Sequence, residues 1–173
     1  MPTPRILIVY FSETGHTRAA AKTLAGLLDA DLESIETAHL GHGFWAWLMR
    51  GFAALRGAMP TIVEPRHAAA DYDMVVLATP VWAGHISSPM RTYAHSQHAA
   101  FKTVAHLLTL GGSGAANAFV DLQHECEKAP LARCAITDRD RKAGKEAEML
   151  AAFAGKIREM VENGGEEKVQ LAA

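Results

Sequence analysis

ILIVYF-SETGHT-RAAAKTLA, residues 6–25, decides how this chain folds. Residues 6–11 are apolar, residues 12–17 are polar and rich in hydroxyls, and residues 18–25 are mostly good helix formers. This order predicts a buried strand, a tight turn and the first turns of a helix. The N-terminus of such a helix favours an anion, because its first N–H groups lack acceptors within the helix and the helix dipole is positive there.

The predicted turn carries hydrogen-bond donors for an anion but no basic side chain. Ser12, Thr14 and Thr17 bring three hydroxyls to it. Residues 12–17 contain neither Lys nor Arg, so hydrogen bonds and the helix dipole alone would hold a bound phosphate. We therefore predict a phosphate-binding loop, whose expected members are Ser12, Glu13, Thr14, Gly15, His16 and Thr17.

The same segment resembles the signature of flavodoxins. That signature combines the apolar end of a strand, a hydroxyl residue, a small residue, a threonine and two apolar helix positions. Here these positions are Ile8, Val9, Tyr10, Ser12, Gly15, Thr17, Ala21 and Leu24, without a mismatch. Two other phosphate-binding loops do not fit, because the segment has neither Gly-x-Gly-x-x-Gly nor Gly-x-x-x-x-Gly-Lys-Ser/Thr. The resemblance implies FMN as the cofactor, with its phosphate in this loop.

Strand-like and helix-like segments alternate along the chain, which is typical of a doubly wound α/β fold. The predicted strands are Arg5–Phe11, Asp31–Ile35, Asp73–Thr79, Thr103–Leu110 and Ala132–Thr137. The predicted helices are His16–Ala30, Phe44–Arg56, Ser88–Ala100, Ala115–Lys128 and Lys142–Asn163. The resemblance implies a flavodoxin-like five-stranded parallel sheet in the order 2-1-3-4-5, with helices on both faces. We expect one domain over residues 1–173, with residues 163–173 as a frayed tail.

Two further loops belong to the predicted site, because ligands of open parallel sheets bind beyond the carboxyl ends of the strands. The third strand runs into a segment whose proline, aromatic and glycine residues favour a shaped loop. The fourth strand runs into glycines that let the main chain approach a ligand. In flavodoxin-like proteins these loops border the flavin, and Trp82 falls where an aromatic commonly contacts it. The expected members are Pro80, Val81, Trp82, Ala83, Gly84 and His85, together with Gly111, Gly112, Ser113 and Asn117.

The second of these loops lacks an aromatic residue. Flavodoxins that shuttle electrons often stack a tyrosine from this loop on the second face of the flavin. Residues 111–117 contain none, and the first aromatic is Phe119, which belongs to the next predicted helix. We therefore expect one face of the flavin to be open.

Other candidate residues give weaker signals. His85 is the titratable side chain beside the expected flavin, where it would orient or protonate a substrate, unless it is a surface imidazole. His95 and His98 have the spacing of two metal ligands, but no third ligand is evident, and a solvated helix end explains them as well. Residues 124–126 are adjacent and cannot share one helix face, so no cysteine-protease arrangement is indicated. We assign no metal site and no catalytic residue.

Composition narrows the possible partners. The 17 basic and 19 acidic residues nearly balance, which indicates neither a nucleic acid nor an anionic membrane as a partner. No apolar stretch approaches the length of about 18 residues that spans a membrane, and none resembles a signal peptide. Cys126 and Cys134 have no metal-ligand spacing. These features together predict a reduced, cytoplasmic protein.

A tryptophan-rich segment departs from a minimal domain. Residues 43–57 contain Trp45, Trp47 and Met49, in addition to the apolar residues that would form one helix face. A helix that is apolar nearly all round must bury more than one side. We expect it to pack under an extra loop, to cover the flavin site, or to lie at a homodimer interface formed by Trp45–Leu55.

The chain thus resembles the group of flavodoxins and NAD(P)H:quinone reductases. This resemblance implies an FMN-binding oxidoreductase that takes hydride from NADH or NADPH and reduces a quinone-like small molecule. Two alternatives stay open. One is a flavodoxin-type single-electron carrier that needs a redox protein as its partner. The other is a fold relative that has lost flavin binding and serves as an interaction module.

Overall fold

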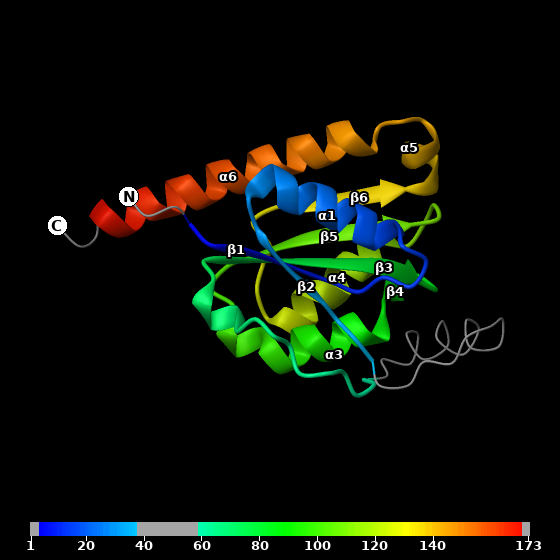
Figure 1. Ribbon diagram of the computed structural model, residues 1–173, viewed down its shortest axis with the longest axis horizontal. Helices are drawn as coiled ribbons and strands as arrows, with labels where there is room; N and C mark the ends of the chain where they lie inside the picture. The colour runs from blue at the N-terminus through cyan, green and yellow to red at the C-terminus, as the bar shows by residue number, and fades with distance from the viewer. Residues whose placement is uncertain (1–3, 38–58, 171–173) are drawn as a thin grey trace.

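Five parallel strands form the centre of the molecule. The computed structural model describes residues 4–37 and 59–170, with only the backbone of residues 163–170. The strands β1 (Ile6–Tyr10), β2 (Asp31–Ser34), β3 (Met74–Trp82), β5 (Val104–Leu110) and β6 (Arg133–Thr137) lie in the order β2-β1-β3-β5-β6 (Figure 1). The two-residue strand β4 (His85–Ile86) pairs antiparallel with the end of β3. Without β4, this order is the predicted 2-1-3-4-5, so the predicted flavodoxin-like topology is confirmed.

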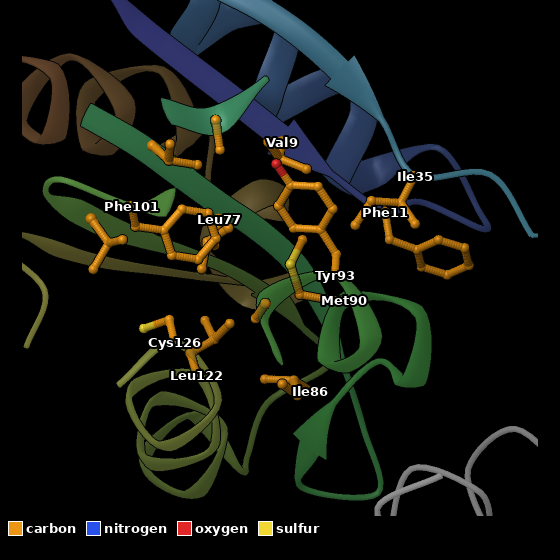
Figure 2. Close-up of a cluster of buried hydrophobic side chains, with 14 of the residues drawn as sticks. Val9, Phe11, Ile35, Leu77, Ile86, Met90, Tyr93, Phe101, Leu122 and Cys126 are labelled. Carbon is orange, nitrogen blue, oxygen red and sulfur yellow. The ribbon is translucent and has the colours of Figure 1, made fainter. Parts of the chain in front are cut away.

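Helices cover both faces of the sheet. On one face lie α1 (His16–Leu28) and α6 (Glu146–Gln170), and on the other lie α3 (Ser88–Gln97) and α4 (Ala115–Cys126) (Figure 1). Two apolar cores result, because the side chains of each strand alternate between the two faces. The core under α3 and α4 contains Leu77, Met90, Tyr93, Phe101 and Leu122 (Figure 2). The strands β1 and β5 are buried along their whole length, as central parallel strands covered on both faces should be.

Several element boundaries differ from the prediction. The strand β3 runs three residues beyond Thr79, and the short helix α5 (Asp138–Lys142) precedes α6. A capping box at Thr137, with Asp140 as its partner, starts α5 immediately after β6. The helix α6 continues past Asn163 to Gln170. Its glycine pair did not end the helix, since each glycine costs only about 1 kcal/mol relative to alanine in a helix interior.

The residues that follow β2 lie beside those that begin the path to β3. Thr37 and Ile62 form an isolated antiparallel bridge, and the Val63 N–H donates to the Glu36 carbonyl over 2.8 Å. The predicted helix Phe44–Arg56 and the Trp45–Leu55 segment lie outside the described residues. Within the described part of the chain, no helix combines the length and apolarity that a membrane crossing requires.

Candidate functional site

The carboxyl ends of β1, β3 and β5 meet at one edge of the sheet, as the sequence predicted. Thr17, which follows β1, has a hydroxyl 2.7 Å from that of Thr109 on β5. Phe11, at the end of β1, meets the Trp82 ring of β3 edge-on, with 5.5 Å between the ring centroids. These contacts join the three predicted loop regions into one site.

The turn before α1 has the form of an anion cradle. Gly15 is the N-cap residue in the left-handed region, with φ 94°, and no side chain of the described residues caps the helix. The first intrahelical hydrogen bond runs from the Ala19 N–H to the Gly15 carbonyl, so the N–H groups of residues 16–18 lack acceptors within the helix. Ser12 shapes the turn by accepting a hydrogen bond from the Gly15 N–H over 3.2 Å. Glu13, Thr14 and His16 are exposed around it.

The Thr17 hydroxyl has a position that the sequence did not reveal. Its side chain is buried, with 2% exposure, and its bond to Thr109 turns it toward β5. A hydroxyl has one proton and two lone pairs, so it can bond Thr109 and still serve a ligand. The side chain therefore also joins the predicted phosphate loop to the sheet.

The segment after Thr79, which we predicted to be a shaped loop, is a tight hairpin that begins with the last residues of β3. Pro80 still pairs with β5, opposite Thr109, while Val81 and Trp82 pair with Ile86 and His85. The two residues of the turn, Ala83 and Gly84, have φ of 49° and 84°. Positive φ at both positions is typical of the type I′ turn, whose twist matches that of the two strands. Proline fits because its missing N–H is tolerated where the strand leaves the sheet.

The hairpin and the glycine-rich loop touch through backbone. Gly114 has φ 96°, and a Cβ built on it would lie 2.6 Å from the Gly84 Cα and 3.3 Å from the Val81 side chain. Only glycine allows this approach. By contrast, Gly112 has open space around it, and Gly111, Gly112, Ser113 and Asn117 are all exposed. These four predicted residues line the open side of the edge.

Phe119 does not cover this edge. Its ring stacks on His106, with 6.4 Å between the centroids, and the Arg133 guanidinium lies over it at 5.4 Å. The aromatic nearest to the glycine-rich loop in sequence is therefore engaged with β5 and β6. Residues 111–117 offer only small and polar side chains to a ligand.

A cluster of charged side chains lies directly behind the hairpin, and the sequence analysis missed most of it. The His85 Nδ1 is 2.9 Å from Asp121 Oδ2, and the same oxygen accepts from Arg91 Nη2 at 3.1 Å and from the Ile86 N–H at 3.3 Å. Arg91 also donates to Glu125 through Nη1. Arg91 and Glu125 are buried, with 8% and 6% exposure.

The pattern of α4 did contain a signal for this cluster. Asp121 and Glu125 are four residues apart and interrupt the apolar stripe formed by Ala118, Leu122 and Cys126. Carboxylates on a buried stripe require a cationic partner, because an unpaired buried charge is costly. Arg91, between the core residues Met90 and Tyr93 of α3, is that partner.

Other histidines have structural roles. His95 contacts Glu125, with 3.3 Å between Nδ1 and Oε2, and its ring centroid lies 6.0 Å from that of His98. The described residues contain no group of three or more side chains able to hold a metal ion. His67 binds Glu33 over 2.5 Å beside a cavity of about 160 Å³ at β2. None of the predicted site residues lines that cavity.

The two cysteines are buried and free. The Cys126 Sγ lies 3.8 Å from Nε2 of His106, which is fully buried on β5. Burial raises the pKa of the Cys126 thiol, and burial raises the pKa of Cys134 to about 11. A buried thiol with a raised pKa is a poor nucleophile, and we place neither cysteine in the site.

The donor set at this edge fits a flavin mononucleotide. A helix N-terminus without a cap, the hydroxyls of Ser12 and Thr14, and exposed N–H groups fit one terminal phosphate. Trp82 on the hairpin offers an aromatic surface, and residues 111–117 offer small side chains, which a planar ring system can lie against. No basic side chain is required, because the backbone carries the positive end of the dipole.

Comparisons with known proteins agree with this arrangement. The model of the flavodoxin family matches residues 5–144. A putative flavoprotein from Bacteroides eggerthii is 25% identical, with a TM-score of 0.69 over 87% of this chain and 98% of that one. A flavoprotein from Lactobacillus acidophilus, solved in complex with FMN, is 18% identical, with a TM-score of 0.67 over 81% and 97% of the two chains. No curated protein matches the chain.

Proposed function

The chain belongs to the flavodoxin family, and from this premise we propose that it binds FMN and catalyses the two-electron reduction of a quinone-like acceptor with NADH or NADPH. The observation that carries the proposal is the uncapped N-terminus of α1 beside the Trp82 hairpin and the glycine-rich loop. The phosphate would occupy residues 12–17, and the ring would lie along residues 80–85 and 111–117. When bound, FMN supplies the hydride chemistry, and the protein supplies binding and orientation.

The side chains around the proposed position of the flavin ring favour the two-electron reaction. Trp82 can flank one side, while residues 111–117 present no aromatic side chain and Phe119 is turned to His106. Hydride transfer requires a nicotinamide stacked within about 3–3.5 Å of the flavin, which an open face permits. The acidic and basic residues of this chain nearly balance, so the chain lacks the strong negative charge that steers a basic redox partner.

The cofactor assignment is tested by comparing FMN with riboflavin. Quenching of flavin fluorescence should show much tighter binding of FMN, because each hydrogen bond to a charged phosphate contributes about 1.5–3 kcal/mol. Thr17→Val should weaken FMN binding, and Thr109→Val is its matched control, since it removes the same Thr17–Thr109 bond and leaves the Thr17 hydroxyl in place. Equal affinity for FMN and riboflavin would refute the phosphate loop.

The reaction type is tested by anaerobic mixing of the FMN-loaded protein with NADH or NADPH. Direct bleaching of the flavin, followed by reoxidation with a small benzoquinone, is expected. Accumulation of a stable one-electron-reduced flavin on dithionite titration, without reduction by either nicotinamide, would instead favour the single-electron carrier.

We also propose that the protein is cytoplasmic and forms a homodimer through residues 45–55, as the apolar residues of that segment suggest. Light scattering at high protein concentration tests the dimer. A Trp45→Glu, Met49→Glu double variant should be monomeric, and a monomeric wild type would refute the proposal.

A further inference from the structure

We propose that His85, oriented by Asp121, donates the proton that the acceptor needs when it is reduced. This inference rests on the proposed function and gives a role to a side chain that the flavodoxin signature does not include. His85 follows the hairpin turn, and its neighbour Gly84 touches the glycine-rich loop. The imidazole therefore lies at the border of the proposed flavin site, with 27% of its side chain exposed.

The contacts of His85 fix which ring nitrogen can exchange a proton. Nδ1 faces Asp121 Oδ2 at 2.9 Å, and a carboxylate oxygen only accepts. Nδ1 must therefore carry a proton in the neutral ring as well as in the charged one. Nε2 is left as the nitrogen that gains and loses a proton, and the side chain that carries it is partly exposed.

Asp121 is itself held from two sides. Arg91 donates to the same oxygen from α3, and the Ile86 N–H donates to it from β4. Glu125 accepts from the other end of the Arg91 guanidinium, and the exposed rings of His95 and His124 lie near Glu125. The cluster around Arg91 thus holds two carboxylates for one guanidinium. These contacts hold the Asp121 carboxylate in place, and the carboxylate in turn holds the His85 ring in one orientation.

The step balances with the reductant that the proposed function names. The quinone gains a hydride, which is two electrons and one proton, from NADH or NADPH by way of the cofactor. Its carbonyl oxygen takes a second proton from Nε2 of the protonated His85. A quinone plus a hydride plus a proton gives the hydroquinone, and solvent returns a proton to Nε2. Asp121 is a positioning residue in this scheme, because it acts only through His85.

The first test compares two electron acceptors in the FMN-loaded protein. Reoxidation by a small benzoquinone requires a proton, whereas reoxidation by ferricyanide takes electrons only. The His85→Gln variant should lower the ratio of the benzoquinone rate to the ferricyanide rate by about 10²-fold, which is the usual contribution of a general acid. The control is His124→Gln, which removes a histidine that is 83% exposed on α4, and it should change neither rate.

The outcomes separate this inference from the proposed function. Equal slowing with both acceptors would show that His85 only shapes the site, and an unchanged benzoquinone rate would show that it donates no proton. Either result overturns the inference alone. A wild type that neither binds FMN nor reduces the quinone overturns the proposed function and this inference together. His85→Phe repeats the test if the glutamine variant does not fold.

The second test needs no cofactor. Nitrogen chemical shifts of His85 in the protein without FMN should show the Nδ1–H form when the ring is neutral. Asp121→Asn keeps an accepting oxygen for Nδ1 and should preserve that form. Asp121→Leu removes the acceptor and should let the proton move to Nε2. A wild-type ring with its proton on Nε2 would overturn the positioning role of Asp121.

Discussion

Two histidines that contact the same helix differ in what their surroundings allow. His85 contacts Asp121 in the middle of α4 and stays partly exposed, whereas His106 lies against Cys126 at the end of α4 and is fully buried. Burial, with a smaller effect from the charge of Arg133, lowers the pKa of His106 to about 3. An ionised partner and access to solvent thus make one imidazole a candidate for chemistry, while burial keeps the other one neutral.

The largest loss of stability is expected when the cation behind His85, Arg91, is removed. Arg91→Leu leaves Asp121 and Glu125 in a buried site without their partner, and breaking a buried pair in this way costs about 3–5 kcal/mol. Urea denaturation should show this loss in the free energy of unfolding. Lys102→Met is the matched control, because its 3.3 Å pair with Asp73 is half exposed and should be worth less than about 1 kcal/mol. Equal losses in the two variants would contradict the assigned roles.

A smaller effect is expected where the hairpin meets the glycine-rich loop. Gly114→Ala places a Cβ 2.6 Å from the Gly84 Cα and forces a left-handed backbone on alanine, which alone costs about 1–2 kcal/mol. The hairpin must shift, so FMN affinity and the His85–Asp121 contact should both be lost in part. Gly144→Ala is the matched control, because Gly144 also has a positive φ, 71°, but has open space around it and is not a predicted site residue, so it should change neither. Flavin titration of the two variants checks this, and equal affinities would show that the contact does not shape the site.

The sequence predicted the sheet and the strand, turn and helix start around residues 6–17 because these depend on local patterns. An apolar run followed by SETGHT determines a strand, a turn and a helix start within a few residues. The hairpin was missed because the proline at residue 80 argued against a strand. The strand tolerates it because the pairing of β3 with β1 has ended at Ala78, before this position. The Thr17–Thr109 and His85–Asp121 contacts join residues 92 and 36 positions apart, and no local pattern specifies such pairs.

The contacts of α4 with His85 and His106 show why chemical roles were harder to predict than the fold. His106 and His85 are the same residue type, each on a strand or at its end, and their neighbours in sequence do not distinguish them. The two histidines differ in the side chains of α4 that contact each ring. Asp121 contacts His85, whereas Cys126 and Phe119 contact His106. These partners become known only when α4 is placed on the sheet.

The last expected effect, modest for each pH unit, is the dependence of stability on pH to which the buried His106 contributes. Its pKa in the folded protein, about 3, lies below the ordinary value of 6.5. Between these values the unfolded chain binds a proton that the folded protein does not, so stability present above about pH 6.5 is lost as the pH falls toward 3, by at most about 1.4 kcal/mol per pH unit. His106→Leu should remove this slope, and because the described residues give Nδ1 no hydrogen-bond partner, the variant should be at least as stable near neutral pH. Urea denaturation above and within this pH window measures the slope, with His124→Gln as an exposed control that should retain it. A slope unchanged by His106→Leu would mean that the ring takes up a proton in the folded state, and the contrast with His85 would then lose its basis.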